Sequence, residues 1–330
     1  MKKVNWGIVS TAKIGTKKVI PAMQKGKYSH ITAIASRDIE KAQRAAQKLN
    51  ITKAYGSYRQ LLDDPEIEAV YIPLPNHMHV KWTIKALEAG KHVLCEKPVA
   101  INVKDAEYLY QKVKDFPHLK VMEAFMYRFH PQWQTVKKLV NEGKIGELRN
   151  IHSIFSYYND DKDDIRNQKE IGGGGLLDIG CYCISLSRFL FNAEPKQVCS
   201  IIEYDPQLKI DRLTTGMLEF QHGHSAFTCS TQLIDHQKVD IFGTQGKIEI
   251  KKPFTPSPEK PSKVKYQTGS QIKEIEFEAC NHYTIQGDLF SQAILNNTAV
   301  PTPLEDGVKN MRVIDKIVES SRMGAWVKLK

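Results

Sequence analysis

Apolar runs of strand length alternate with helix-length segments over the first third of the chain, and this alternation constrains the fold more than any other feature. The runs cover 4–10, 31–35, 69–73, 92–95 and 121–125, and amphipathic segments at 39–49, 80–88 and 105–114 separate them. Strands joined through helices pair in parallel. The pattern therefore predicts an α/β fold that begins with a doubly wound parallel sheet of the Rossmann type.

The second half follows a different pattern, because strands succeed one another with few helices between them. The expected strands are 148–158, 198–204, 214–220, 225–233, 239–242, 247–250, 264–267 and 273–277. Such a run predicts an α+β domain with a large, mostly antiparallel open sheet. We expect a dinucleotide-binding domain at 1–123 and a substrate-binding and oligomerisation domain at 124–330. A sheet covered on one face favours a homodimer, or a dimer of dimers, through the other face.

Composition excludes several classes of protein. The net charge is +10, but the basic excess lies in the first half and is scattered along helical segments without interleaved aromatics, which argues against nucleic acid. No apolar run reaches the roughly 18 residues of a membrane span. Six cysteines without a CxxC pair indicate reduced thiols and no structural metal. We expect a cytoplasmic protein with no membrane partner.

The turn after the first strand is the expected phosphate-binding element. It connects a strand to a helix, an arrangement that directs backbone N–H groups at a pyrophosphate. Only Gly15 of the G-x-G-x-x-G pattern is present, because Ser10 and Ala12 occupy the other glycine positions. The candidate cofactor-binding residues in this turn are Ser10, Thr11, Ala12, Lys13 and Ile14.

The end of the second strand indicates which dinucleotide is bound. Ser36 and Arg37 stand about twenty residues after the turn, where an acidic residue would favour NAD. A guanidinium can instead bind a 2′-phosphate and stack on adenine, so NADP(H) is preferred over NAD(H). An Arg37 side chain directed at water is the competing interpretation.

Further candidates follow the fourth and fifth strands, since ligands of open parallel sheets bind beyond the carboxyl ends of strands. For His79, packing or helix capping competes with a cofactor contact. Lys97, followed by Pro98, is either a working lysine or a turn residue. The candidate residues in these two loops are Pro73, Leu74, Asn76, His79, Glu96 and Lys97.

A glycine run at 172–175 precedes an apolar helix that carries Asp178 and Tyr182. Residues four apart project from one helix face, and a buried carboxylate and phenol need partners or a ligand. The alternative is that Tyr182 is a core aromatic residue hydrogen-bonded to Asp178. The glycine run argues against it, because glycines leave no side chains at that end of the helix.

The chain resembles the Gfo/Idh/MocA oxidoreductases over essentially its whole length. The matching motifs are Ala86 to Pro98 (ALEAGKHVLCEKP), Arg128 to Pro131 (RFHP), Gly173 to Tyr182 (GGGLLDIGCY) and Phe242 to Gly246 (FGTQG). The resemblance implies an N-terminal Rossmann domain, a C-terminal sheet used for oligomerisation, and hydride transfer between a nicotinamide and a sugar- or cyclitol-like alcohol. Tyr182 and the 10–12 and 36–37 segments look more like dihydrodiol, D-xylose and glucose–fructose enzymes than like inositol dehydrogenases.

Oxidation of an alcohol requires a base for the hydroxyl proton, and a phenol of pKa ~10 can serve only when a cation stabilises its anion. We expect Tyr182 to be the acid/base, Lys97 to stabilise it, and Asp178 to orient Lys97 or the substrate. Lys97 as the proton carrier stays open, as do a cofactor-sensing regulator and a nicotinamide-dependent glycosidase. The substrate, a polyol, an aldose or an aromatic dihydrodiol, is expected to contact Phe125, Arg128, Phe155, Tyr158 and Asp164.

Overall fold

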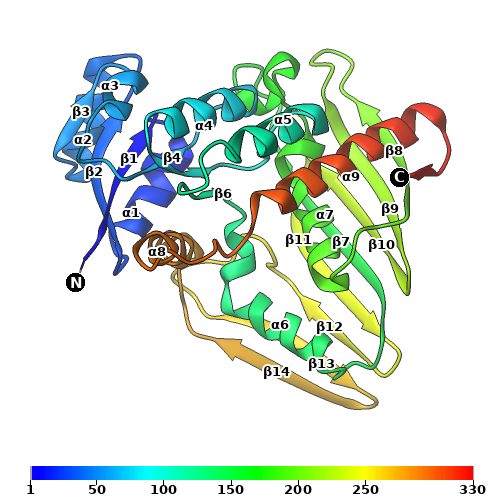
Figure 1. Ribbon diagram of the computed structural model, residues 1–330. Helices are drawn as coiled ribbons and strands as arrows, with labels where there is room; N and C mark the ends of the chain where they lie inside the picture. The colour runs from blue at the N-terminus through cyan, green and yellow to red at the C-terminus, as the bar shows by residue number, and fades with distance from the viewer. Residues whose placement is uncertain (1, 330) are drawn as a thin grey trace. The chain divides into compact units, whose positions relative to one another are not determined.

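The computed structural model describes residues 2–329, which form two compact units. Among the described residues, the first unit contains 2–126 and 281–308, and the second contains 127–280 and 309–329 (Figure 1). The predicted division at 123/124 stays a prediction. After residues 127–280, which belong to the second unit, the chain returns to the first unit at 281–308.

The first unit is built on a six-stranded sheet. Its strand order is β3-β2-β1-β4-β5-β6 and every neighbouring pair is parallel, which is the order of a Rossmann fold and confirms the predicted fold class. The strands are β1 Val4–Val9, β2 Ser29–Ala35, β3 Lys53–Tyr55, β4 Ala69–Ile72, β5 His92–Cys95 and β6 Val121–Glu123.

Side-chain caps fix where the helices between these strands begin. Asp38 accepts a hydrogen bond from Lys41 N at 3.2 Å, and Asn102 accepts one from Asp105 N at 2.8 Å. Each cap satisfies an amide that lacks an intrahelical acceptor. The helical segments are η1 Gly15–Val19, α1 Ile20–Met23, α2 Ile39–Leu49, α3 Tyr58–Leu62, η2 Asn76–Met78, α4 His79–Glu88 and α5 Val103–Val113.

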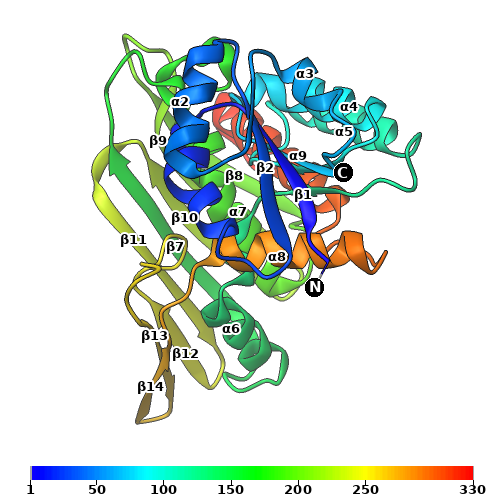
Figure 2. The same cartoon turned by 90° about the vertical axis from the view of Figure 1, so that its left-hand side faces the viewer.

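Helix α8 (His282–Leu295) completes the first unit from a distant part of the chain (Figure 2). Phe290 packs on Trp6 of β1 with ring centroids 5.6 Å apart, and the Trp6 indole donates to Ser291 Oγ at 3.1 Å. Asp288 accepts from the backbone N of Lys27 and of Tyr28, both at 2.9 Å. The helix is thus fixed to the start of β2 as well as to β1.

The second unit contains a nine-stranded sheet of order β14-β13-β12-β11-β7-β10-β9-β8-β15. The β7–β10 pair is parallel and the other pairs are antiparallel, so the predicted mostly antiparallel sheet is confirmed. The strands are β7 Leu148–Tyr158, β8 Gln197–Tyr204, β9 Asp211–Phe220, β10 Gly223–Ser230, β11 Gln232–Gly243, β12 Gly246–Ile250, β13 Ser262–Thr268, β14 Gln271–Phe277 and β15 Val327–Lys328.

Helix α7 lies on the sheet at β7 and β10 and continues a π-helical turn, η6. Within residues 2–329, the segment Lys169–Phe191 is the one long and apolar enough to cross a membrane, but 78% of its most apolar window is buried, as in the core helix of a soluble protein. The helical segments here are η3 Met126–Phe129, α6 Pro131–Asn141, η4 Ile165–Asn167, η5 Lys169–Ile171, η6 Leu176–Gly180, α7 Cys181–Phe191 and α9 Leu304–Met323.

The short edge strand β15 pairs with β8 only at Gln197 and Val198, and the end of α9 covers the next residues of β8. Ser320 Oγ accepts from Ser200 N at 3.0 Å, and Ser321 Oγ accepts from Ile202 N at 3.1 Å. Ser200 in turn donates to Ile317 O at 2.6 Å. Two amides that an edge strand would otherwise present outward are therefore satisfied within the unit.

Candidate functional site

Ser10 adopts a backbone conformation that normally belongs to glycine. Its φ of 127° lies in the region that side chains disfavour, at the position where the dinucleotide pattern has its first glycine. The hydroxyl accepts from Ala12 N and donates to Pro73 O, both at 3.2 Å. These two bonds hold the turn after β1 against the loop after β4.

The helical segment that follows begins at Lys13 and passes into the π-helical turn η1. The first amides of a helix have no intrahelical acceptor and lie at the positive end of its dipole. Gly15 faces Pro73, and a Cβ on it would lie 3.5 Å from that proline ring. The predicted residues Thr11, Lys13 and Ile14 therefore form a helix start that fits a pyrophosphate.

Ser36 and Arg37 follow β2 with different environments. Ser36 is buried, and its hydroxyl accepts from Asp38 N at 3.2 Å. Arg37 is exposed and lies close enough to Tyr58 to oppose the effect of burial, which raises the pKa of that phenol. An exposed guanidinium at this strand end could bind an anionic group of the cofactor. That Arg37 binds the 2′-phosphate of NADP stays a prediction.

His79 connects the two loops that carry the remaining cofactor candidates. Its ring is fully buried, with Nδ1 2.7 Å from Pro98 O and Nε2 2.7 Å from Leu74 O. Burial lowers the pKa of His79 to about 4, although both carbonyls oppose that change. The histidine thus has the packing geometry that competed with a cofactor contact, and it holds the loop after β4 to the residue that follows Lys97.

Glu96 is oriented at the end of β5 by its neighbours. The buried Tyr71 hydroxyl donates to Glu96 Oε1 at 2.5 Å, and Lys97 N donates to Glu96 Oε2 at 3.3 Å. The Lys97–Pro98 peptide is cis. Asn76 opens η2 in the neighbouring loop, after the buried Pro73 and Leu74. Lys97 therefore directly follows a strand end that the hydrogen bond between Tyr71 of β4 and Glu96 holds in place.

Asp178 lies in the π-helical turn η6, where two side chains hold its carboxylate. Tyr157 Oη donates to Asp178 Oδ2 at 2.6 Å, and Arg166 Nε lies 3.5 Å from the same oxygen. Arg166 also pairs with Asp164, whose Oδ1 accepts from Arg166 N at 2.9 Å. Burial raises the pKa of Tyr157, with the Asp178 charge adding to the effect, and Asp178 is the main cause of the raised pKa of Arg166. The carboxylate has an adjacent cation and is suited to accept hydrogen bonds.

Tyr182 is 5% exposed and lies among three aromatic rings. The centroids of Tyr127, Phe155 and Phe254 are 5.7, 5.8 and 5.5 Å from that of Tyr182. Phe155 and Phe254 stack on one another at 5.2 Å. The phenol thus has apolar walls, which strengthen any electrostatic interaction made at its oxygen.

The other predicted substrate residues have varied surroundings. Arg128 is buried, donates to Ser185 Oγ at 2.7 Å, and lies over the Phe189 ring. Tyr158 is 65% exposed and donates to Asp160, whereas Phe125 is fully buried after β6. Within the second unit, Arg166 links Asp164 to Asp178. Phe155 packs against Tyr182. The roles of Phe125, Arg128 and Tyr158 stay predictions.

Tyr157, Arg166 and Phe254 were missed from the sequence, and one of them left a signal. Phe155 and Tyr157 share a face of β7 because side chains alternate along a strand, whereas Tyr158 points to the opposite face. The period of two therefore favoured Tyr157 over Tyr158. Arg166 lies in a charged loop and Phe254 in a Pro-rich one, and no local pattern distinguishes either.

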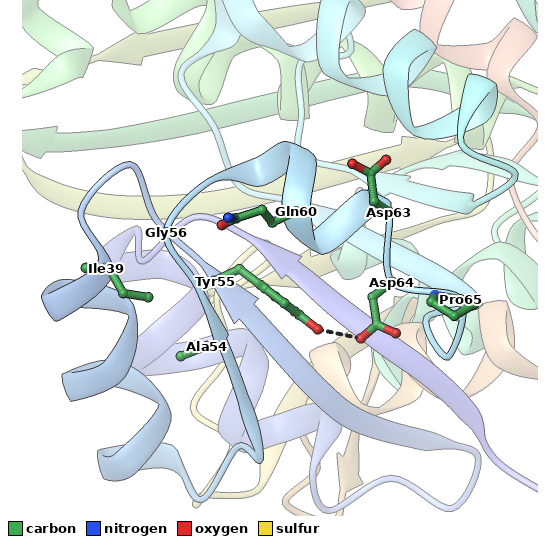
Figure 3. Close-up of a pocket in the computed structure, with 8 residues that line it drawn as sticks. All are labelled: Ile39, Ala54, Tyr55, Gly56, Gln60, Asp63, Asp64 and Pro65. Atoms are coloured by element: carbon green, nitrogen blue, oxygen red, sulfur yellow. Dashed lines mark hydrogen bonds between the residues drawn. The ribbon is translucent and has the colours of Figure 1, made fainter.

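A surface pocket of about 520 Å³ lies beside β3 of the first unit (Figure 3). Tyr55 Oη donates to Asp64 Oδ2 at 2.8 Å, and Lys53 pairs with Asp64 at 2.9 Å, so its polar groups bond to one another. None of the predicted site residues lines it. The lining residues are Ile39, Ala54, Tyr55, Gly56, Gln60, Asp63, Asp64 and Pro65.

The parallel sheet, the helix start after β1 and the strand-end residues together define a dinucleotide-binding oxidoreductase domain. The model of the oxidoreductase family with an NAD-binding Rossmann fold matches residues 4–123, and the model of the GFO/IDH/MocA C-terminal domain matches residues 133–249. The chain belongs to the Gfo/Idh/MocA family of NAD(P)-dependent oxidoreductases.

Relatives include enzymes with different substrates. D-xylose 1-dehydrogenase (NADP(+)) 2 of Haloferax volcanii is 35% identical over 98% of this chain and 99% of its own. Trans-1,2-dihydrobenzene-1,2-diol dehydrogenase of Xenopus tropicalis is 34% identical over 74% of each chain. The 3-ketoreductase KijD10 of Actinomadura kijaniata, solved with NADP and TDP-benzene, superposes with a TM-score of 0.90 at 28% identity over 98% of each chain.

Proposed function

We propose that the protein is an NADP(H)-preferring dehydrogenase acting on a secondary or anomeric alcohol of a sugar, polyol or dihydrodiol. The observation that carries the proposal is the placement of Asp178 and Tyr182 at the start of one buried helix, with the carboxylate bound by Arg166 and the phenol walled by aromatic rings. The xylose and dihydrodiol relatives support the class of substrate, and the NADP-dependent relatives support the cofactor.

Tyr182 is the proposed acid/base, with Lys97 and Asp178 completing the proton-transfer group. When bound, the nicotinamide supplies or accepts the hydride. A phenol of ordinary pKa ~10 takes up a substrate proton only where a cation stabilises the phenolate, which is the role given to Lys97. Asp178, already paired with Arg166, accepts a hydrogen bond and orients its partner rather than moving the proton.

The cofactor-binding part of the proposal uses the residues of the first unit. Ser10 to Ile14 bind the pyrophosphate at the helix start, and Ser36 and Arg37 bind the 2′-phosphate of NADP. Pro73, Leu74, Asn76 and His79 form or support the loop beside the nicotinamide, next to Glu96.

The first experiment is a screen of aldoses, polyols and trans-dihydrodiols with NADP⁺ and with NAD⁺, followed by absorbance of the reduced cofactor. Net reduction of NADP⁺ with a preference over NAD⁺ is the expected result. Product without net cofactor reduction would point to a nicotinamide-dependent glycosidase, and cofactor binding without any turnover would point to a sensor. A clear preference for NAD⁺ would contradict the role given to Arg37.

The proton-transfer group is tested by Tyr182→Phe and Lys97→Met. Each is expected to lower kcat on the order of 10² to 10⁴-fold, the usual contribution of a positioned acid or base, without a matching loss of cofactor affinity. Tyr108→Phe and Lys104→Met change exposed residues of the same types and serve as controls. Near-normal turnover of the Lys97 variant would refute the assignment of Lys97.

A cytoplasmic homodimer, or a dimer of dimers, is part of the same proposal. Ile201, Met217 and Phe242 lie on the sheet face opposite α7 and α9. The exposed fractions of these three residues are 77%, 41% and 36%, respectively. Exposed apolar side chains on one broad face favour association through that face. Ile201→Glu is expected to shift the mass measured by light scattering toward the monomer, and an unchanged mass would contradict the use of this face.

A further inference from the structure

Asp211, the first residue of β9, is bonded to the start of the helix that carries Asp178 and Tyr182. Asp211 Oδ2 accepts a hydrogen bond from Leu176 N at 2.5 Å. Leu176 opens η6, so this amide is one of those left without an intrahelical acceptor. A carboxylate at this position also interacts favourably with the helix dipole.

The glycine run is shaped around this carboxylate. Gly174 has a φ of 124°, and a Cβ on it would lie 1.9 Å from Asp211 Oδ1. Gly174 N donates to Arg166 O at 2.8 Å, and Gly173 N donates to Gln168 O at 3.0 Å. The glycines therefore allow close contact between the loop that carries Arg166, the carboxylate of Asp211 and the first turn of η6.

Two carboxylates thus fix the same helical turn, one through the backbone of the turn and the other through a side chain of the turn. Asp211 binds the backbone of the turn at Leu176, while the side chain of Asp178 in that turn is bound by Tyr157 and Arg166. An extra residue per turn, as in a π-helical segment, is a local irregularity that must be maintained by such contacts. Loss of the Asp211–Leu176 bond would free the turn to relax.

We propose that Asp211 is a positioning residue for the reaction, which holds the π-helical turn 176–180 so that Asp178 and Tyr182 keep their productive orientation. The inference rests on the proposed function of those two residues. Asp211 touches neither of the reacting groups in this role. It acts through the backbone of Leu176.

The charge state of Asp211 determines the strength of this bond. Burial raises the pKa of Asp211 to about 7, and the charged or titratable groups that face it are Asp178, Tyr204 and Cys229. Because the closed turn favours the protonated carboxyl, ionisation opposes it, and the turn should be held less firmly above pH 7 than below it.

The test compares Asp211→Ala and Asp211→Asn with Asp205→Asn in the full-length protein. Asn at 211 keeps an acceptor oxygen but loses the charge. Asp205 is a matched control, because its carboxylate accepts from Gln207 N and Leu208 N, both at 2.8 Å, within the turn that follows β8. Amide hydrogen exchange of the 174–182 peptide is measured by mass spectrometry at pH 6 and pH 8, together with kcat, KM and NADP affinity.

We expect Asp211→Ala, which removes the acceptor, to speed exchange in 174–182 about 10-fold at pH 6, corrected for intrinsic rates, with a smaller change at pH 8. It should lower kcat roughly 10-fold while leaving NADP affinity unchanged. Asp205→Asn should leave both the exchange of 174–182 and kcat as in the wild type. Asp211→Asn does not titrate, so its exchange in 174–182 should lose the difference between pH 6 and pH 8; where the alanine variant fails to fold, this result decides.

Unchanged exchange in 174–182 would overturn the proposal whatever the activity. Faster exchange with wild-type kcat would also overturn it, because the turn would then position nothing that the reaction uses. A wild-type protein without activity on any alcohol tested would refute the proposed function instead, and exchange would still report on the hold of Asp211 on the helix.

Discussion

Replacing Asp211 by asparagine should change how the stability of the second unit depends on pH. The folded protein raises the pKa of this carboxyl from its ordinary value of 3.8 to about 7, mainly through burial. The folded state therefore binds a proton that the unfolded chain has already lost in this range. The stability contributed by Asp211 is fully present below pH 3.8 and is lost as pH rises through 7.

The magnitude follows from the difference between the two pKa values. One pH unit corresponds to about 1.4 kcal/mol, so ionising Asp211 costs the folded state about 4 kcal/mol by pH 8. An asparagine does not titrate. The Asp211→Asn variant should therefore match the wild type near pH 4 and become more stable than it by up to about this amount at pH 8.

The assay is urea unfolding between pH 4 and pH 8, read by a brief pulse of thiol labelling at Cys183 and Cys229. Both cysteines are fully buried in the second unit and become reactive only when it unfolds. Asp205→Asn is the control of opposite sign, because hydrogen bonds led by that from Leu208 N lower the pKa of Asp205. That variant should be less stable than the wild type at neutral pH, and the deficit should close as pH falls. Parallel pH profiles for Asp211→Asn and the wild type would refute the reasoning.

Substitutions at Ser10, His79 and Gly174, with Gly143 as a control, test the geometry of the two units by urea or thermal unfolding. Ser10→Gly should be more stable than Ser10→Ala by about 1 kcal/mol, because both lose the hydroxyl bonds but only glycine relieves the φ of 127°; equal stabilities would contradict a strained Ser10. His79→Leu should cost roughly 1 to 3 kcal/mol, since the neutral ring donates its one N–H to one of the two buried carbonyls, which leucine would leave without a donor, and a neutral effect would show that this bond contributes little. Gly174→Ala should cost more than 3 kcal/mol, roughly, because its Cβ would meet Asp211, whereas Gly143→Ala, with a φ of 66° and open space, should cost roughly 1 to 2 kcal/mol. Equal costs for the two glycine variants would argue against close packing at Gly174.

Local pattern was enough to place many elements. The helix 39–49 and the strands 92–95 and 148–158 have the predicted bounds, because a capping residue or a turn marks where each apolar run begins or ends. The candidate pair Asp178 and Tyr182 came from spacing on a helix together with family motifs. These signals all lie within a few residues of the feature they predict.

Contacts between distant segments could not be read in the same way. The packing of Phe290 on Trp6 joins residues almost 300 positions apart, and nothing near either residue indicates it. The parallel pairing of β7 with β10 inside an otherwise antiparallel sheet is likewise a matter of long-range order. Arg166 became a site residue only through its loop, which places it beside Asp178. The glycine pattern at 10–15 was incomplete, yet Ser10 takes up the glycine conformation, and its hydroxyl bonds to Ala12 N in the turn and to Pro73 O in the loop after β4.

The two serine hydroxyls at the end of α9 have a consequence for the behaviour of this protein at high concentration. By engaging the amides of Ser200 and Ile202, they leave an incoming chain without two of the donors it would need to pair with the part of β8 that β15 does not cover. Open-ended growth into filaments from that border is therefore disfavoured. Removing both hydroxyls would expose a template for strand addition, so resistance to fibrillation in this molecule depends in part on two small side chains at the end of α9.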